Sequence, residues 1–94
     1  MYGETMIEEL LAERGKVHGD FTYHALFTQC LKENMRNAPN WNNLSHVQKE
    51  SLEMIQHKIG RILAGDPNHA DHWDDIAGYA TLAAQRVENL ENKK

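Results

Sequence analysis

Apolar residues recur along this chain at the spacing of helices. Apolar and polar residues never alternate over the length of a strand, and glycine, proline or asparagine separates four apolar-periodic stretches. The pattern predicts an all-α fold with helices over about residues 4–14, 21–35, 45–64 and 71–90. We expect a single domain over residues 1–94, with residues 88–94 as a frayed, charged tail.

The predicted helix ends rest on local signals. Gly15 is expected to end the first helix, and Asp20 is placed to cap the second. Ser45 and Gln48 form a capping-box pattern at the start of the third helix, and Gly65-Asp66-Pro67 supplies its stop. The third and fourth helices then form a long antiparallel hairpin. The predicted architecture is a helical bundle of about four helices built on this hairpin.

Projection at about 100° per residue divides each long helix into two sides. The apolar arcs are expected to form the hairpin seam, and they consist of Leu52, Ile55, Ile59, Ile62 and Leu63 with Trp73, Ile76, Ala80, Ala83, Ala84 and Val87. Gly60 and Gly78 lie on the opposite sides, where each costs about 1 kcal/mol relative to alanine. Something is therefore expected to pack close to them, either the first two helices or a second subunit. A homodimer or higher homo-oligomer is favoured, because 94 residues make a small core.

Composition narrows the function classes. Ten Lys and Arg residues oppose fourteen Asp and Glu residues, and the net charge of -4 argues against binding a nucleic-acid polymer. Cys30 is the only cysteine, so an intramolecular disulfide is impossible, and its apolar neighbours predict a buried, inert thiol. No apolar run approaches the roughly 20 residues of a membrane span, and residues 1–13 lack the basic start of a secretory signal. We expect a cytoplasmic protein.

Carboxylates with ligand-like spacing occur on both long helices. Glu50 and Glu53 are three residues apart, and Asp71 is followed by Asp74 and Asp75. Mg²⁺ prefers oxygen ligands, and carboxylates on facing helices can share a metal ion. The alternative is structural, because acidic residues favour the first turn of a helix and solvated faces. Since both acidic stripes point away from the seam, a metal site needs another helix layer or a partner subunit.

Basic residues supply candidates for anion binding. Lys16 and His18 lie between two glycines just ahead of the second helix, where a turn can receive an anion. Lys58 and Arg61 on the third helix could also contact phosphates. The alternatives are an ordinary turn and long side chains that lie over the bundle surface.

Three segments carry a resemblance to known proteins. Residues 14–21, 57–68 and 71–80 resemble a family of small phage and prophage proteins of unknown function, and this resemblance covers about residues 10–87. A weaker resemblance links Glu50-x-x-Glu53 and Asp71-x-x-Asp74, with Asp75 following, to MazG-like all-α nucleoside triphosphate pyrophosphatases. That family binds Mg²⁺ at such motifs, works as a dimer or tetramer, and releases pyrophosphate from nucleoside triphosphates. The family's doubled glutamate is replaced here by Lys49-Glu50.

Together these features give one leading hypothesis and two alternatives. The leading hypothesis is a Mg²⁺-dependent nucleotide pyrophosphohydrolase of phage or prophage origin, active in the host cytoplasm. The metal ligands would be Glu50, Glu53, Asp71 and Asp75, and the substrate contacts would be Lys16, His18, Lys58 and Arg61. The alternatives are a non-enzymatic phage accessory protein that binds a host protein, and a degenerate enzyme that binds a nucleotide without turnover.

Overall fold

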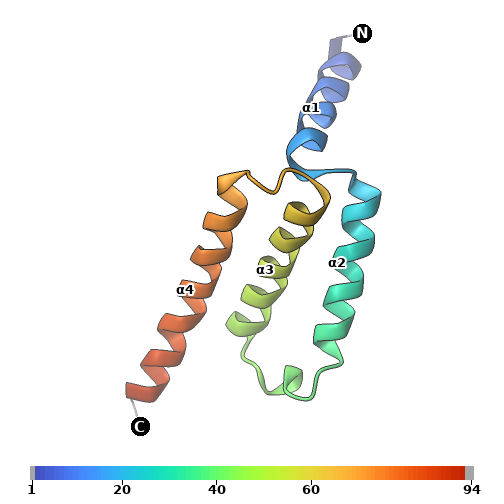
Figure 1. The fold of residues 1–94 in the computed structure, drawn as a ribbon. Helices are drawn as coiled ribbons and strands as arrows, with labels where there is room; N and C mark the ends of the chain where they lie inside the picture. The colour runs from blue at the N-terminus through green and yellow to red at the C-terminus, as the bar shows by residue number, and fades with distance from the viewer. Residues whose placement is uncertain (1, 93–94) are drawn as a thin grey trace.

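A computed structural model describes residues 2–92 and is entirely helical in its regular structure (Figure 1). The elements are α1 (Tyr2–His18), α2 (Phe21–Arg36), the 3₁₀ turn η1 (Trp41–Asn43), α3 (His46–Ala64) and α4 (Ala70–Asn92). Within these residues there is no strand, so the predicted all-α fold is confirmed. None of their helices combines the length and the hydrophobicity that crossing a bilayer requires.

The capping signals in the sequence act as predicted at α2 and α3. The Asp20 side chain accepts a hydrogen bond from the Tyr23 backbone amide at 3.2 Å, which fixes the start of α2. At α3, the Ser45 hydroxyl accepts from the Gln48 amide at 3.1 Å, while the Gln48 side chain accepts from the Ser45 amide at 2.9 Å. Both donors of this capping box are therefore satisfied.

One predicted helix end was wrong. Helix α1 does not stop at Gly15 but continues to His18, and the amide of Gly19 still bonds the Gly15 carbonyl at 3.0 Å. A glycine inside a helix costs only about 1 kcal/mol, so Gly15 alone cannot end it. Gly19, with a φ of 85°, provides the left-handed residue that breaks the chain direction. The predicted frayed tail is helical as far as Asn92, and residues 93–94 lie outside the described part.

Helices α2, α3 and α4 lie side by side, with α3 between the other two (Figure 1). The most extensive contact joins α3 and α4, which confirms the predicted hairpin. On its other side, α3 meets α2 at Gly60, where an added Cβ would lie 2.7 Å from the Thr28 hydroxyl and 3.0 Å from His24 Nδ1. The prediction that something packs close to Gly60 is confirmed, whereas Gly78 has nothing within 4 Å.

Burial in this chain is the reverse of an ordinary core. Among residues 6–91, whose side chains are described, no apolar side chain is fully buried. The buried side chains are polar: His24, Thr28, Ser51, Gln56 and His72. Cys30 was predicted to be buried and is exposed, because α3 covers a different side of α2. The fully buried side chains are therefore polar, while the large apolar residues are at most half-buried and many of them are exposed.

The predicted hairpin seam is only half correct. Its half-buried members lie between α3 and α4, and these are Ile55, Ile62, Ile76, Ala83 and Val87. The other members stay exposed, and these are Leu52, Ile59, Leu63, Trp73, Ala80 and Ala84. The reason is geometric: helices α2 and α4 contact α3 on nearly opposite sides, so the arc between those contacts has nothing over it.

The layer formed by α2, α3 and α4 consequently has two distinct faces. The apolar face consists of Tyr23, Leu26, Phe27, Cys30, Leu52, Ile59, Leu63, Trp73, Ala77, Ala80 and Ala84. The polar face lies on the other side and carries Ala25, Lys32, Glu50, His57, Arg61, Asp71, Asp75, Gly78, Leu82 and Gln85.

Candidate functional site

A cavity of about 520 Å³ opens where α1 ends, α2 begins and α3 approaches its last turn. We call it the histidine cavity. Its lining consists of Leu11, Arg14, Gly15, His18, Gly19, Asp20, Phe21, His24, His57 and Arg61. Three helices thus contribute to one hollow, and each brings at least one histidine.

Two glycines allow the backbone contact that shapes this end of the molecule. A Cβ on Gly19 would overlap the carbonyl oxygen of Ala64, and one on Gly65 would overlap the carbonyl oxygen of Val17. The Asp66 amide also donates to the Val17 carbonyl at 2.9 Å. The end of α1 is therefore fixed against the end of α3, and this contact sets the position of His18.

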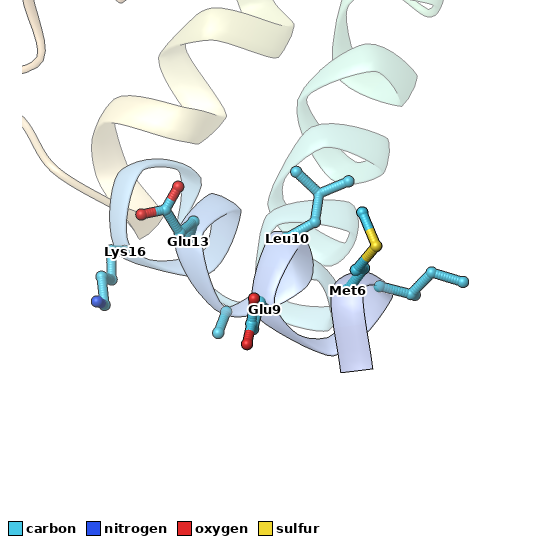
Figure 2. A pocket seen from close by; sticks show the side chains of 7 residues that line it. Met6, Glu9, Leu10, Glu13 and Lys16 are labelled. Atoms are coloured by element: carbon cyan, nitrogen blue, oxygen red, sulfur yellow. The ribbon is translucent and has the colours of Figure 1, made fainter. Parts of the chain in front are cut away.

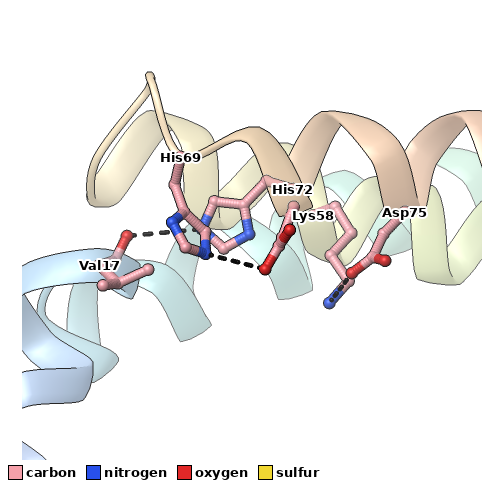
Figure 3. A network of polar contacts seen from close by, with 6 residues as sticks. Val17, Lys58, His69, His72 and Asp75 are labelled. Atoms are coloured by element: carbon pink, nitrogen blue, oxygen red, sulfur yellow. Dashed lines mark hydrogen bonds and ion pairs between the residues drawn. The ribbon is translucent and has the colours of Figure 1, made fainter.

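The histidine rings meet in pairs. The rings of His24 and His57 are perpendicular, with their centroids 4.6 Å apart, and His24 packs directly over Gly60. The rings of His18 and His72 lie 5.1 Å apart at 45°. His72 also lies close to the chain before Gly19, because its Nε2 is 3.5 Å from the Val17 carbonyl oxygen (Figure 3).

All four of these histidines are disposed to remain neutral. Burial, followed by the positive charge of Arg61, lowers the pKa of His18 and that of His57 from 6.5 to about 4. Burial also lowers the pKa of His24 and of His72. At neutral pH each ring therefore has one N–H donor and one acceptor nitrogen.

Some of the buried nitrogens lack a partner. His24 Nε2 lies 3.4 Å from the Thr28 hydroxyl, but His24 Nδ1 has no hydrogen-bond partner within residues 2–92. The Nδ1 atom of His18 also has no hydrogen-bond partner among these residues. Buried polar atoms are nearly always satisfied in proteins, so His18 Nδ1 is an atom that a water or a bound molecule would contact, whereas His24 Nδ1 faces Gly60 in the α2–α3 contact.

Two guanidinium groups border the cavity. None of the ion pairs between the side chains of residues 6–91 engages Arg61 or Arg14. Asp20 is the one carboxylate in the lining, and it already accepts a hydrogen bond as the cap of α2. Arg61 is half-buried, and its charge lowers the pKa of the surrounding histidines, so its field is not cancelled locally.

The structure separates the four predicted substrate contacts. His18 and Arg61 line the histidine cavity. Lys58 does not, because it forms an ion pair with Asp75 at 3.0 Å on the neighbouring part of the polar face (Figure 3). Lys16 is exposed and borders a shallow depression on α1 with Met6, Leu10 and two glutamates (Figure 2).

The four predicted metal ligands are also kept apart. Glu53 pairs with Arg36 of α2 at 2.6 Å, and Asp75 pairs with Lys58. Asp71 lies 3.7 Å from His69 Nε2, and Glu50 borders a separate hollow between α3 and α4. Among residues 6–91, whose side chains are described, no group of three or more His, Cys, Asp or Glu residues is placed to hold a metal ion. A single chain therefore does not assemble these carboxylates into one centre.

Of the arginine and histidine residues that line the cavity, three were not among the predicted contacts. Arg14 belongs to the same glycine-flanked segment as Lys16, and the extension of α1 beyond Gly15 turns Arg14 rather than Lys16 toward the cavity. His57 lies one turn before Arg61, so their shared face was readable from the sequence. His24 depends on its long-range contact with Gly60, which no local pattern indicates.

Comparison with known proteins gives one match. Residues 5–87 match a family model described as "Domain of unknown function (DUF6378)". No curated protein and no solved structure matches the chain.

Proposed function

The chain belongs to this family of unknown function, and we propose from its geometry that it binds a phosphate-bearing small molecule of nucleotide size in the histidine cavity. The proposal rests above all on Arg61, a half-buried guanidinium that no ion pair between the side chains of residues 6–91 engages. A guanidinium withdrawn from water without a counter-charge favours an anion, and its planar donors match the oxygens of phosphate.

The neutral histidines can form hydrogen bonds with the ligand beside Arg61 without adding charge. Their N–H groups can donate to phosphate oxygens, while their unprotonated nitrogens can accept from a sugar or a base. His18 Nδ1 is buried without a partner among the residues whose side chains are described, so a ligand there would satisfy an atom that is otherwise costly.

The dimensions and the rim of the cavity suit a nucleotide. Its volume of about 520 Å³ lies within the roughly 300–1,000 Å³ of small-molecule sites. The Phe21 ring at the rim is 78% exposed and offers a flat apolar surface against which a base could stack. Arg14 lies across the opening and adds a second positive charge.

Mg²⁺-dependent hydrolysis is a separate proposal and needs more than one chain. Glu50, Glu53, Asp71 and Asp75 would have to leave their present surroundings and share an ion across a partner subunit. The nucleotide-binding function needs no such rearrangement, so we place it first. A phage or prophage source and a host-protein partner also stay proposals.

Calorimetry on the full chain tests the binding function. We would titrate inorganic phosphate, pyrophosphate, and nucleoside mono- and triphosphates, first in chelator and then with Mg²⁺. Arg61→Ala should weaken binding by about 10- to 100-fold, the usual contribution of a charged hydrogen-bonded contact. Lys16→Ala is the matched control, because it removes a cation that lies outside the cavity, and it should change affinity by less than about twofold.

Other results would lead to different conclusions. If no phosphate compound binds saturably, or if both variants weaken binding equally, the histidine cavity is not the site. Mg²⁺-dependent release of pyrophosphate that Glu53→Ala abolishes would instead support the hydrolase.

A further inference from the structure

The centre of the apolar face of the α2–α4 layer is uncovered and built from uncharged residues, and charge enters only where Glu88 and Glu91 continue the line of Ala84 at the C-terminal end of α4. Leu63 is 58% exposed, Trp73 55% and Ile59 38%. On α4, Ala77, Ala80 and Ala84 continue the surface with small side chains that allow a neighbouring helix to approach. We propose that this face packs against the same face of a second copy of the chain.

The layering of the fold is the first argument. Stable domains are built from at least two layers of secondary structure around a shared apolar core. Here one layer of three helices is present, its fully buried side chains are polar, and no apolar side chain of residues 6–91 is fully buried. A second layer on the apolar face would turn Leu52, Ile59 and Leu63 into the missing core.

The surface area gives the second argument. The chain exposes 7173 Å², whereas a compact monomer of 10.8 kDa exposes about 5,500 Å². Its radius of gyration is 16.6 Å, against about 12 Å for a compact chain of 94 residues. The excess area is about 1,600 Å² per chain, and part of it lies on α1, which projects from the layer (Figure 1). Removal of the full excess from both copies would fall within the roughly 2,000–5,000 Å² of obligate homodimers.

The chemistry of the face favours a second copy over a different protein. A two-fold interface places one patch against itself, so the patch must be self-complementary. The centre of the face meets this condition because its residues are uncharged, and the only carboxylates on that side of α4, Glu88 and Glu91, lie at its C-terminal end. The centre also lacks the charge pattern that selects a distinct partner. The histidine cavity opens on the other side of α3, so both copies keep their cavities accessible in such a dimer, and this inference does not rest on the proposed ligand.

Light scattering during gel filtration, combined with thermal unfolding at several concentrations, tests the dimer. The wild type should elute at twice 10.8 kDa, and its Tm should rise with protein concentration. Ile59→Glu should weaken association by about 100-fold or more, because a carboxylate would be buried without a partner. Leu82→Glu is the matched control, since Leu82 is more exposed than Ile59 (47% against 38%) but lies on the polar face.

Each outcome decides the proposal. If Ile59→Glu unfolds, the concentration dependence of the wild-type Tm still distinguishes a dimer from a monomer. A wild type that is monomeric, with a Tm independent of concentration, would overturn the proposal. So would a dimer that survives Ile59→Glu and Ala80→Glu but dissociates with Leu10→Glu, because α1 would then form the interface.

Discussion

The two faces of the helical layer differ in the interactions that a single chain leaves unsatisfied. The apolar face presents side chains such as Leu63 that require only burial, and any complementary apolar surface supplies it. The polar face holds Arg61 and buried imidazole nitrogens, which require partners of defined charge and direction. Ile59 and Arg61 are only two residues apart, so they project from nearly opposite sides of α3. The comparison suggests that one helix supports assembly and ligand binding independently, provided that the α2–α3 contact between the two faces is intact.

A substitution at Gly60, where α2 and α3 meet, should disrupt both faces at once. Gly60→Ala should destabilise the fold by about 1–3 kcal/mol, because the added Cβ would meet Thr28 and His24, both of which are buried. Urea unfolding would measure this loss, and dimer formation and phosphate binding should weaken together. Gly15→Ala is the control, since nothing lies within 4 Å of that position and the helix propensity favours alanine. A Gly60→Ala protein as stable as wild type would disprove the tight contact.

Acid should destabilise the polar face selectively. The pKa of His18 and of His57 is about 4 in the folded chain and about 6.5 when unfolded, so the unfolded state binds protons first. Stability contributed by neutral rings is complete above pH 6.5 and decreases as the pH falls toward 4. The facing groups are Arg61, Lys58, His69 and His72 around His18, and Arg61, Lys32, Lys58 and His24 around His57.

The measurement is the urea midpoint between pH 8 and pH 5. His57→Gln should make its pH dependence shallower by up to about one proton per chain, since one lowered histidine is removed. The dimer dissociation constant should change little between pH 8 and pH 6.5, because the apolar face carries no histidine. An unchanged slope in His57→Gln would show that this ring is not held neutral by the fold.

Local patterns predicted the helices well but not the surfaces that the helices bury. The capping box at Ser45 and the cap at Asp20 depend on residues within one turn, so the sequence alone located the starts of α3 and α2. The end of α1 depends on the contact of Gly19 with Ala64, which are 45 positions apart, and it was misplaced. Amphipathic periodicity identified the apolar side of α3 correctly. It could not show whether α4 or, as proposed above, a second copy packs against that side.

The site shows the same limit. His18 was singled out because it lies in a glycine-flanked turn ahead of a helix, and Arg61 because it is a basic residue of the third helix; both line the cavity. Lys16 and Lys58 were chosen on the same ground and lie elsewhere, since side-chain direction depends on how far α1 extends and on the pairing of Lys58 with Asp75. Spacing alone could not show that Glu53 pairs with Arg36, because α2 and α3 meet only in the folded chain.

Thiol labelling would compare how well the two faces are protected. In a Cys30→Ser background, Ala80→Cys places a thiol on the apolar face and Gln85→Cys places one on the polar side of α4; both positions are exposed in a single chain. In the native dimer, Ala80→Cys should react about 10-fold more slowly, which corresponds to about 1.4 kcal/mol of protection. The two rates should become equal in urea. Equal rates under native conditions would contradict a covered apolar face.

The smallest expected effect comes from comparing the two faces on α4 alone. Gly78 lies on the polar face of α4 with nothing within 4 Å, so Gly78→Ala should stabilise the protein by about 0.5–1 kcal/mol through helix propensity alone. Ala80→Gly is the reciprocal change on the apolar face. It should lower the free energy of unfolding by more than about 1 kcal/mol, because in the proposed dimer it also removes packing against the second copy. Urea unfolding of both variants at one protein concentration gives the two values. If Gly78→Ala were destabilising, a partner would have to lie close to the polar face, and the assignment of the two faces would be reversed.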